Sequence, residues 1–159
     1  AESVVQSDEK AIVFAQNKGK VESALANHFQ IDSPRIILNS YKSREQLDSL
    51  TAKFFDQIDY IVAPSHERTN WALGLGLPMF ILEPPIGPFA PLNKVALLQA
   101  EVAESISSPN EAKGFSKRLA YLQKSGELAK MAQAGWEKHP ITGFRTIADF
   151  LINKYVPSA

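Results

Sequence analysis

The sequence predicts an α/β protein built on a Rossmann-like, doubly wound parallel sheet. Three observations lead to this fold class: the apolar runs are short and continuous, helical patterns separate them, and turn residues bound them. Strands that are apolar throughout are buried on both faces, as in parallel sheets covered by helices. Right-handed crossovers then produce a three-layer α/β/α sandwich.

The predicted elements alternate along the chain. The strands are the apolar runs at residues 11–15, 35–39, 60–63 and 79–82, with a short fifth strand at 103–107. Apolar side chains at helical spacing predict helices at residues 17–29, 43–58, 67–75 and 91–102, followed by a helix-rich tail from 108 to 155.

Local signals indicate where several of these helices begin and end. Ser43 with Gln46 forms a capping box at the start of the second helix. Gly76 is expected to end the third helix. Ser108 followed by Pro109 is typical of a helix start. The tail is expected to break near Gly126 and again at 139–140.

Composition excludes several classes of protein. The chain has 159 residues, no cysteine, and 17 basic side chains balancing 17 acidic ones. Disulfides and thiolate sites are therefore excluded, and the charge balance shows no nucleic-acid footprint. The three histidines are far apart, so no metal or other cofactor is expected. No apolar run approaches the ~20 residues of a membrane span. We expect a soluble, cytoplasmic protein.

The loops after the strands are the candidate ligand-binding segments, because ligands of parallel sheets lie beyond the carboxyl ends of the strands. The segment 64–70 joins a strand to a helix, and helix N-termini favour anions. Its candidate binding residues are Ser65, His66, Arg68, Thr69 and Asn70. Arg68 and Thr69 are expected to be exposed. The alternative interpretation is a capped helix with a solvated polar first turn.

Four further residues share this predicted edge of the sheet. Gly19, between two lysines, can approach a phosphate, or it belongs to a solvated surface turn. Asn39 ends the second strand. Glu83 and Asn93 can hydrogen-bond sugar hydroxyls, although Glu83 alternatively caps a turn. Residues 83–91 include four prolines, which predict a stiff wall beside the site.

The stretch 58–103 resembles the donor-binding C-terminal half of GT-B glycosyltransferases, and is similar to the peptidoglycan N-acetylglucosaminyltransferase and galactolipid synthase group. The matching positions are Asp59, Ser65, Gly76, Pro78, Asn93 and Ala103. The resemblance implies that residues 1–159 form a single donor-binding domain for a nucleotide-sugar, a UDP-sugar by the family's preference. It also implies an acceptor held by a separate N-terminal domain or partner chain, so that this chain is a fragment or one half of a split transferase.

The chain departs from the family pattern at several positions. Trp71 stands where the family carries a glutamate that binds the donor ribose, and an indole cannot accept the hydrogen bonds that a carboxylate accepts. Trp71 is alternatively a core residue or a platform for a base or sugar. The family's glycine-rich loop is reduced to Gly19, and its sugar-binding pair is replaced by the proline-rich run.

Three functions follow as hypotheses. The first is glycosyl transfer from a nucleotide-sugar. The second is a non-catalytic relic that binds a ligand or docks a partner. The third is an epimerase-like enzyme acting on sugar nucleotides, because a fold does not determine its function.

Overall fold

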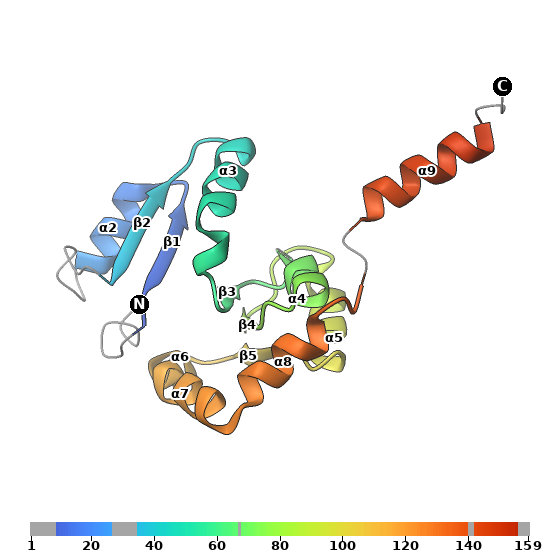
Figure 1. The fold of residues 1–159 in the computed structure, drawn as a ribbon. Helices are drawn as coiled ribbons and strands as arrows, with labels where there is room; N and C mark the ends of the chain where they lie inside the picture. Colours follow the sequence, from blue (N-terminus) through green and yellow to red (C-terminus); the bar gives the residue numbers. More distant parts are fainter. Residues whose placement is uncertain (1–8, 27–34, 67, 140–141, 156–159) are drawn as a thin grey trace. The chain divides into compact units, whose positions relative to one another are not determined.

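A computed structural model describes residues 9–26, 35–66, 68–139 and 142–155. The described residues form an α/β protein with two small parallel sheets, which confirms the predicted class at that level (Figure 1). The chain divides into two compact units. Unit 1 takes its residues from Ala1–Asp59 and Ile106–Ser125, and unit 2 from Tyr60–Ser105 and Gly126–Ala159.

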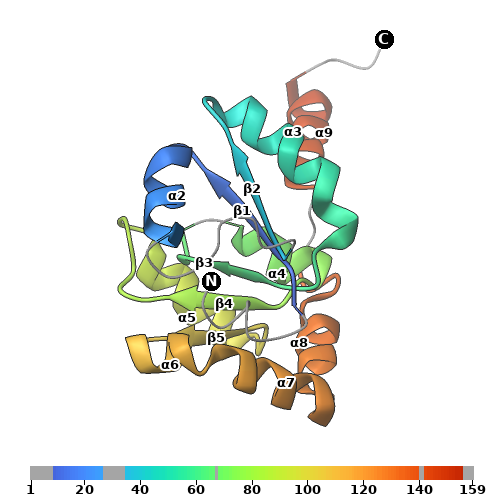
Figure 2. The ribbon, with the colours of Figure 1, turned by 90° about the vertical axis from the view of Figure 1, so that its left-hand side faces the viewer.

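Unit 1 is organised around a two-stranded parallel sheet. Its strands are β1 (Ala11–Ala15) and β2 (Ile36–Ser40), and its helices are α2 (Lys18–Ala26), α3 (Arg44–Phe54), η1 (Phe55–Gln57), α6 (Pro109–Lys113) and α7 (Phe115–Ser125). Ala11 pairs with Ile36 and Ala15 with Ser40. Figure 2 shows α2 and α3 to either side of this pair. The rings of Phe14 and Phe54 are 6.3 Å apart and join β1 to α3.

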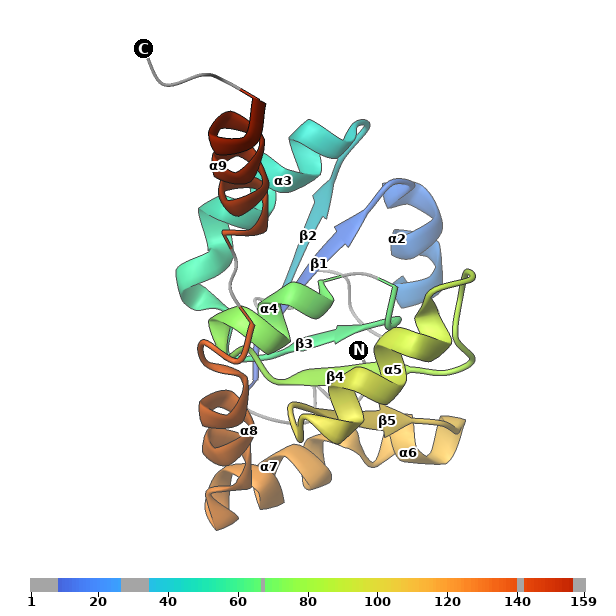
Figure 3. The same ribbon diagram turned by 90° about the vertical axis from the view of Figure 1, so that its right-hand side faces the viewer.

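Unit 2 contains a three-stranded sheet in the order β3-β4-β5. Its strands are β3 (Ile61–Ala63), β4 (Met79–Leu82) and β5 (Ala103–Ile106), and its helices are α4 (Thr69–Leu75), α5 (Ala90–Gln99), α8 (Glu127–Gly135) and α9 (Gly143–Tyr155). The three arrows point the same way in Figure 3, where α4 and α5 lie in front of the sheet. Ile61 pairs with Met79 in parallel register. The predicted central strand at 79–82 is therefore confirmed.

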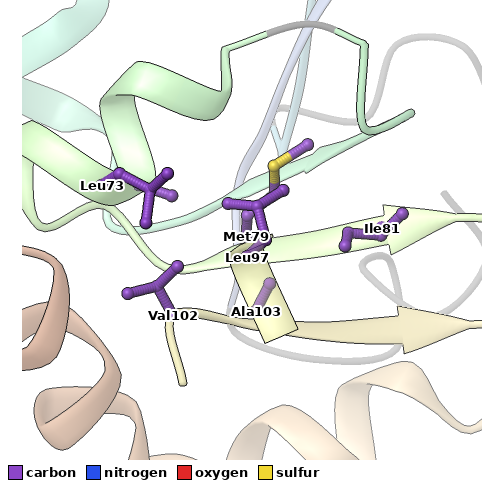
Figure 4. Packing of buried hydrophobic residues seen from close by; sticks show 7 residues of the cluster. Leu73, Met79, Ile81, Leu97, Val102 and Ala103 are labelled. Atoms are coloured by element: carbon purple, nitrogen blue, oxygen red, sulfur yellow. The ribbon is translucent and has the colours of Figure 1, made fainter. Parts of the chain in front are cut away.

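The core of unit 2 lies between β4 and the helices α4 and α5. Its buried members, most of them drawn in Figure 4, are Ala72, Leu73, Met79, Ile81, Leu97, Val102 and Ala103. Neighbouring residues of a strand point to opposite faces, so Phe80 lies on the other face from Met79 and Ile81. Phe80 is also buried, and its ring meets that of Tyr60 edge-on at 5.6 Å. The first three residues of β4 are thus buried on both faces, as its continuous apolar run predicts, whereas Leu82 at its end is exposed.

The contact between α4 and α8 is unusually close because Gly135 lacks a side chain. A Cβ atom added to Gly135 would lie 1.9 Å from the carbonyl oxygen of Ala72. After α8, the His139 N–H donates to the Leu73 carbonyl at 2.8 Å. The last carbonyls of a helix have no partner inside it. His139 therefore supplies the hydrogen-bond donor that the Leu73 carbonyl does not find within the short helix α4.

Helix boundaries follow the predicted caps with small shifts. Ser43 and Ser108 accept hydrogen bonds from backbone N–H groups three residues later, as predicted. Gly76 ends α4 with a left-handed φ of 65°, and the break at Gly126 has a φ of 76°. The first helix begins at Lys18, one residue later than predicted, and its predicted residues 27–29 lie outside the described residues, as does Pro140 in the second predicted break.

Two predicted helices are shorter than expected because left-handed residues interrupt them. The helix predicted at 67–75 begins only at Thr69, since Arg68 has a φ of 59°. The helix predicted at 91–102 ends at Gln99, since Glu101 also has a φ of 59°. Across the described ranges, no helix is long and apolar enough to cross a membrane.

Candidate functional site

The turn after β3 is built around Ser65, which is completely buried. Its hydroxyl donates to the carbonyl oxygen of Ala90 at 2.8 Å. Its own carbonyl oxygen accepts from the Asn93 side-chain amide at 2.9 Å and from the Thr69 hydroxyl at 3.2 Å. These bonds join the turn after β3 to the first residues of α5. The two loops beyond the carboxyl ends of β3 and β4 are therefore fixed to each other.

Arg68 holds a defined position in the same turn. Its backbone is left-handed, a conformation that costs a residue with a side chain about 1 kcal/mol or more. Its guanidinium carbon lies 4.3 Å from the centre of the Trp71 ring, a cation–π contact that contributes about 0.5–1 kcal/mol at such sites. The contact offsets part of the backbone cost and keeps the guanidinium over the indole.

The expectation that Arg68 and Thr69 are exposed is wrong, because both are half-buried. Arg68 is covered in part by its contact with Trp71, and Thr69 turns its hydroxyl inward to Ser65. Trp71 is itself half-buried rather than a full member of the core. His66 and Asn70 are the exposed candidates of this turn.

Glu83 follows β4 directly, and its carboxylate forms an ion pair with the ammonium group of Lys94 from α5. The same carboxylate accepts a hydrogen bond from the Ser105 hydroxyl of β5 at 3.4 Å. The Glu83 side chain is only 12% exposed. The Lys94 side chain is 30% exposed, so the pair is partly solvated and its loss costs less than that of a fully buried pair. Glu83 therefore serves first as an internal link between β4, α5 and β5.

The loop between β4 and α5 presents its side chains to solvent. Every residue from Pro84 to Phe89 is exposed, and Gly87 has a left-handed φ of 86°. The prolines fix the backbone of this loop. The wall predicted beside the site is thus present next to Glu83, although its side chains offer no charge to a ligand.

Two predicted site residues, Gly19 and Asn39, belong to unit 1, whereas the other seven belong to unit 2. Gly19 lies in α2, where an added Cβ would meet only the Asn17 side-chain oxygen at 3.8 Å. Nothing packed against this position in the described structure requires a glycine. The Asn39 side-chain nitrogen is buried and has no hydrogen-bond partner among the described residues.

Sequence reasoning missed Lys94 and Ser105, the two partners of Glu83. Lys94 is the only charged residue of α5, and a lone charge on an apolar helix is the signal that could have identified it. Ser105 gives no such signal, because its role depends on β5 lying beside β4. The Ala90 carbonyl oxygen was also missed, since backbone groups have no signature in a sequence.

The described part of the chain holds no cluster of three or more acidic, histidine or cysteine side chains that could bind a metal ion. The polar chemistry at the carboxyl ends of β3 and β4 consists instead of one guanidinium, one ion pair, and several amide and hydroxyl groups. No protein-family model, curated protein or solved structure matches the chain.

Proposed function

We propose that this chain is the donor-binding domain of a GT-B-like glycosyltransferase, and that a nucleotide-sugar binds beyond the carboxyl ends of β3 and β4. The observation that carries the proposal is the set of hydrogen bonds around Ser65, which joins the turn after β3 to the start of α5. Ligands of parallel α/β sheets occupy this end of the strands. A site whose loops are already ordered loses less entropy when it binds a ligand.

The proposal gives Arg68 the role of binding the diphosphate of the donor. Guanidinium groups bind phosphate oxygens through paired, charge-assisted hydrogen bonds. The contact with Trp71 holds the guanidinium near the indole, so the Arg68 side chain loses less conformational freedom when it binds a phosphate. His66 and Asn70, both exposed in the same turn, add hydrogen-bonding groups for phosphate or ribose.

Sugar transfer on such a site is a displacement at the anomeric carbon of the donor. The acceptor hydroxyl oxygen forms the new glycosidic bond and gives up its proton to water or to the departing diphosphate, which leaves with the electron pair of the broken anomeric C–O bond. The diphosphate leaves with additional negative charge, which a fixed cation stabilises. The acceptor is held by a second domain or a partner chain in this proposal, since residues from a single donor domain supply only half of such a site.

We infer further that the strands and helices from β1 to β5 belong to a Rossmann-like fold, a doubly wound sandwich with three α/β/α layers. The parallel pairing of β1 with β2 and of β3 with β4 supports this fold. Parallel strands joined by helices require crossover connections, which are right-handed in nearly all proteins.

Nucleotide binding is tested by the thermal shift of the full chain with UDP, GDP, ADP or dTDP at millimolar concentration. A ligand at ten times its Kd stabilises the fold by about 1.4 kcal/mol. For a chain of this size, that raises the Tm by about 3–6 °C. No shift with any of the four nucleotides contradicts the proposal.

The matched variants are Arg68→Asn and Arg118→Gln. Asparagine tolerates a left-handed backbone, so Arg68→Asn removes the guanidinium without adding strain. Arg118 lies 5.2 Å from the ring of Tyr121 and thus provides a second arginine stacked on an aromatic side chain, in unit 1. The nucleotide shift should be lost in Arg68→Asn and kept in Arg118→Gln. If the nucleotide raises the Tm of both variants equally, Arg68 does not bind the nucleotide.

The contacts of the Glu83 carboxylate favour a second proposal, in which the domain is a non-catalytic relic of a transferase. The carboxylate is committed to Lys94 and Ser105, and Trp71 stands where the resembling family has its ribose-binding glutamate. Such a domain binds a ligand or a partner without transferring a sugar. Nucleotide binding without hydrolysis or transfer of any UDP-sugar, in the presence of candidate acceptors, is the result that favours it.

A further inference from the structure

Helix α5 is apolar on its outer side as well as on its buried side. Ala90 and Leu97 are buried, whereas Leu92 and Val95 project into solvent. Its one charged residue, Lys94, is paired with Glu83. A surface helix normally has a polar outer face, and a helix that is apolar all round is normally buried. The outer side of α5 therefore has the composition of a covered surface.

The apolar outer side continues into the loop before the helix. We call Ile86, Phe89, Leu92 and Val95 the α5 surface; these residues are 51% to 70% exposed. Single exposed apolar residues are common, but four large ones within ten positions form a patch of the kind that marks an interaction site.

Helix α9 carries a second surface of this kind in the same unit. Ile147, Phe150, Leu151 and Ile152, which we call the α9 surface, are 48% to 59% exposed. Ile147, Phe150 and Leu151 share one side of the helix, Asp149 and Asn153 lie opposite, and Ile152 lies on the flank next to Asp149. The described part of unit 2 thus has these two exposed apolar surfaces. Helix α9 also has a distinct polar side, whereas helix α5 has none.

We propose that a second copy of this chain covers both surfaces, with α9 of each copy packed on the α5 surface of the other. An aromatic side chain buries roughly 150–250 Å² and a branched aliphatic one somewhat less, so each of these eight half-exposed residues contributes about 100 Å². One copy then buries about 800 Å² and the pair about 1,600 Å², the usual size of a stable protein–protein interface. Either surface alone provides about half of that area.

The chemistry of the α5 surface favours a protein partner over a lipid surface. Helices that bind anionic membranes carry lysine and arginine beside their apolar face. The segment 84–93 contains no basic residue, and the adjacent Lys94 is paired with Glu83. Helix α9 does carry Arg145 and Lys154, so the test includes anionic vesicles to address that helix. The reciprocal contact between two copies is also closed by a two-fold axis, so it ends at a dimer rather than continuing into a fibre.

The mass of the full chain in solution is the first test, measured by light scattering from about 1 to 100 µM. A dimer has twice the 17.5 kDa of one chain. Leu92→Lys and Ile147→Glu should each shift the chain to monomer, because each places an unpaired charge in both contacts of the dimer. Tyr121→Ser is the matched control, since Tyr121 is a similarly exposed large residue outside both surfaces. It should leave the dimer intact.

A mixture of the two charged variants tests the pairing of α9 with α5 itself. In a mixed dimer, one contact brings the new lysine against the new glutamate, and the other contact is the unmodified pair. Mixing should therefore restore a dimer that neither variant forms alone. A chain that stays monomeric at 100 µM overturns the proposal. So does a dimer that both variants leave intact, or a monomer that sediments with phosphatidylglycerol vesicles.

Discussion

Replacing Gly135 with alanine should destabilise the protein, although alanine is the better helix former. Gly135 is the last residue of α8, where α8 contacts α4. The added Cβ would lie 1.9 Å from the Ala72 carbonyl oxygen and 3.1 Å from a methyl carbon of Val102. The first atom belongs to the backbone of a buried helix, so it cannot rotate away as a side chain can.

Two opposing terms decide the magnitude. Helix propensity favours alanine over glycine by about 1 kcal/mol in a helix interior, and by less at a helix end. Inserting a methyl group into a tightly packed contact costs about 1–3 kcal/mol, and more where backbone must move. Because relief of a 1.9 Å approach requires α8 to move away from α4, we expect a net loss of about 2 kcal/mol. That lowers the Tm by about 4–8 °C for a chain of this size.

Urea and thermal denaturation followed by circular dichroism measure this loss. Gly19→Ala is the matched control, because Gly19 is also helical and its added Cβ would have its nearest neighbour at 3.8 Å. The control should be neutral or slightly stabilising. If Gly135→Ala is as stable as the unmodified chain, the close approach of α8 to α4 is refuted.

Phe80→Ala should cost about 3–5 kcal/mol in urea denaturation, because it removes a buried ring and its contact with Tyr60; a loss under about 1 kcal/mol contradicts the burial of β4 on both faces. Ser43→Ala should cost about 1 kcal/mol by removing the cap of α3. The hydrogen bond from Ser43 is also the first cause that lowers the pKa of the Glu45 carboxyl, so NMR titration should find that pKa raised in the variant. A carboxyl with a lowered pKa stabilises the fold above its ordinary pKa, and this stabilisation is lost in acid. The difference in unfolding free energy between the unmodified chain and Ser43→Ala should therefore narrow as the pH falls. If the pKa of Glu45 is the same in both chains, the hydrogen bond between Ser43 and the Glu45 carboxyl is contradicted.

The strands were predictable because each is a continuous apolar run bounded by turn residues. Ala11–Ala15 and Met79–Leu82 match the predicted ranges, β2 begins and ends one residue later than predicted, and β3 and β5 are each one residue shorter. Caps were predictable for the same local reason: Ser43, Gly76 and Ser108 act on N–H and carbonyl groups a few positions away. Local chemistry determines such features, so one sequence window contains them.

The site was less predictable because its contacts join distant parts of the chain. Ser65 was predicted as a ligand-binding residue, yet its hydroxyl bonds to the backbone of Ala90, 25 residues later. Glu83 was predicted to accept from a sugar, yet it is paired with Lys94. Polar residues at strand ends have the same pattern whether they bind a ligand or hold two loops together. Only their partners in space distinguish the two roles.

The two units are interleaved along the chain, and this order has a consequence for synthesis. The chain passes from one unit to the other at residues 59–60, 105–106 and 125–126. Neither unit is therefore a contiguous gene segment that can be expressed by truncation at a single point. The His139 N–H donates to the Leu73 carbonyl, and His139 is synthesised roughly 65 residues after Leu73. At 5–20 residues per second, this delay lasts about 3–13 s. During that interval a nascent unit 2 exposes the side of α4 that α8 later covers, which makes it a candidate substrate for chaperones that bind apolar segments.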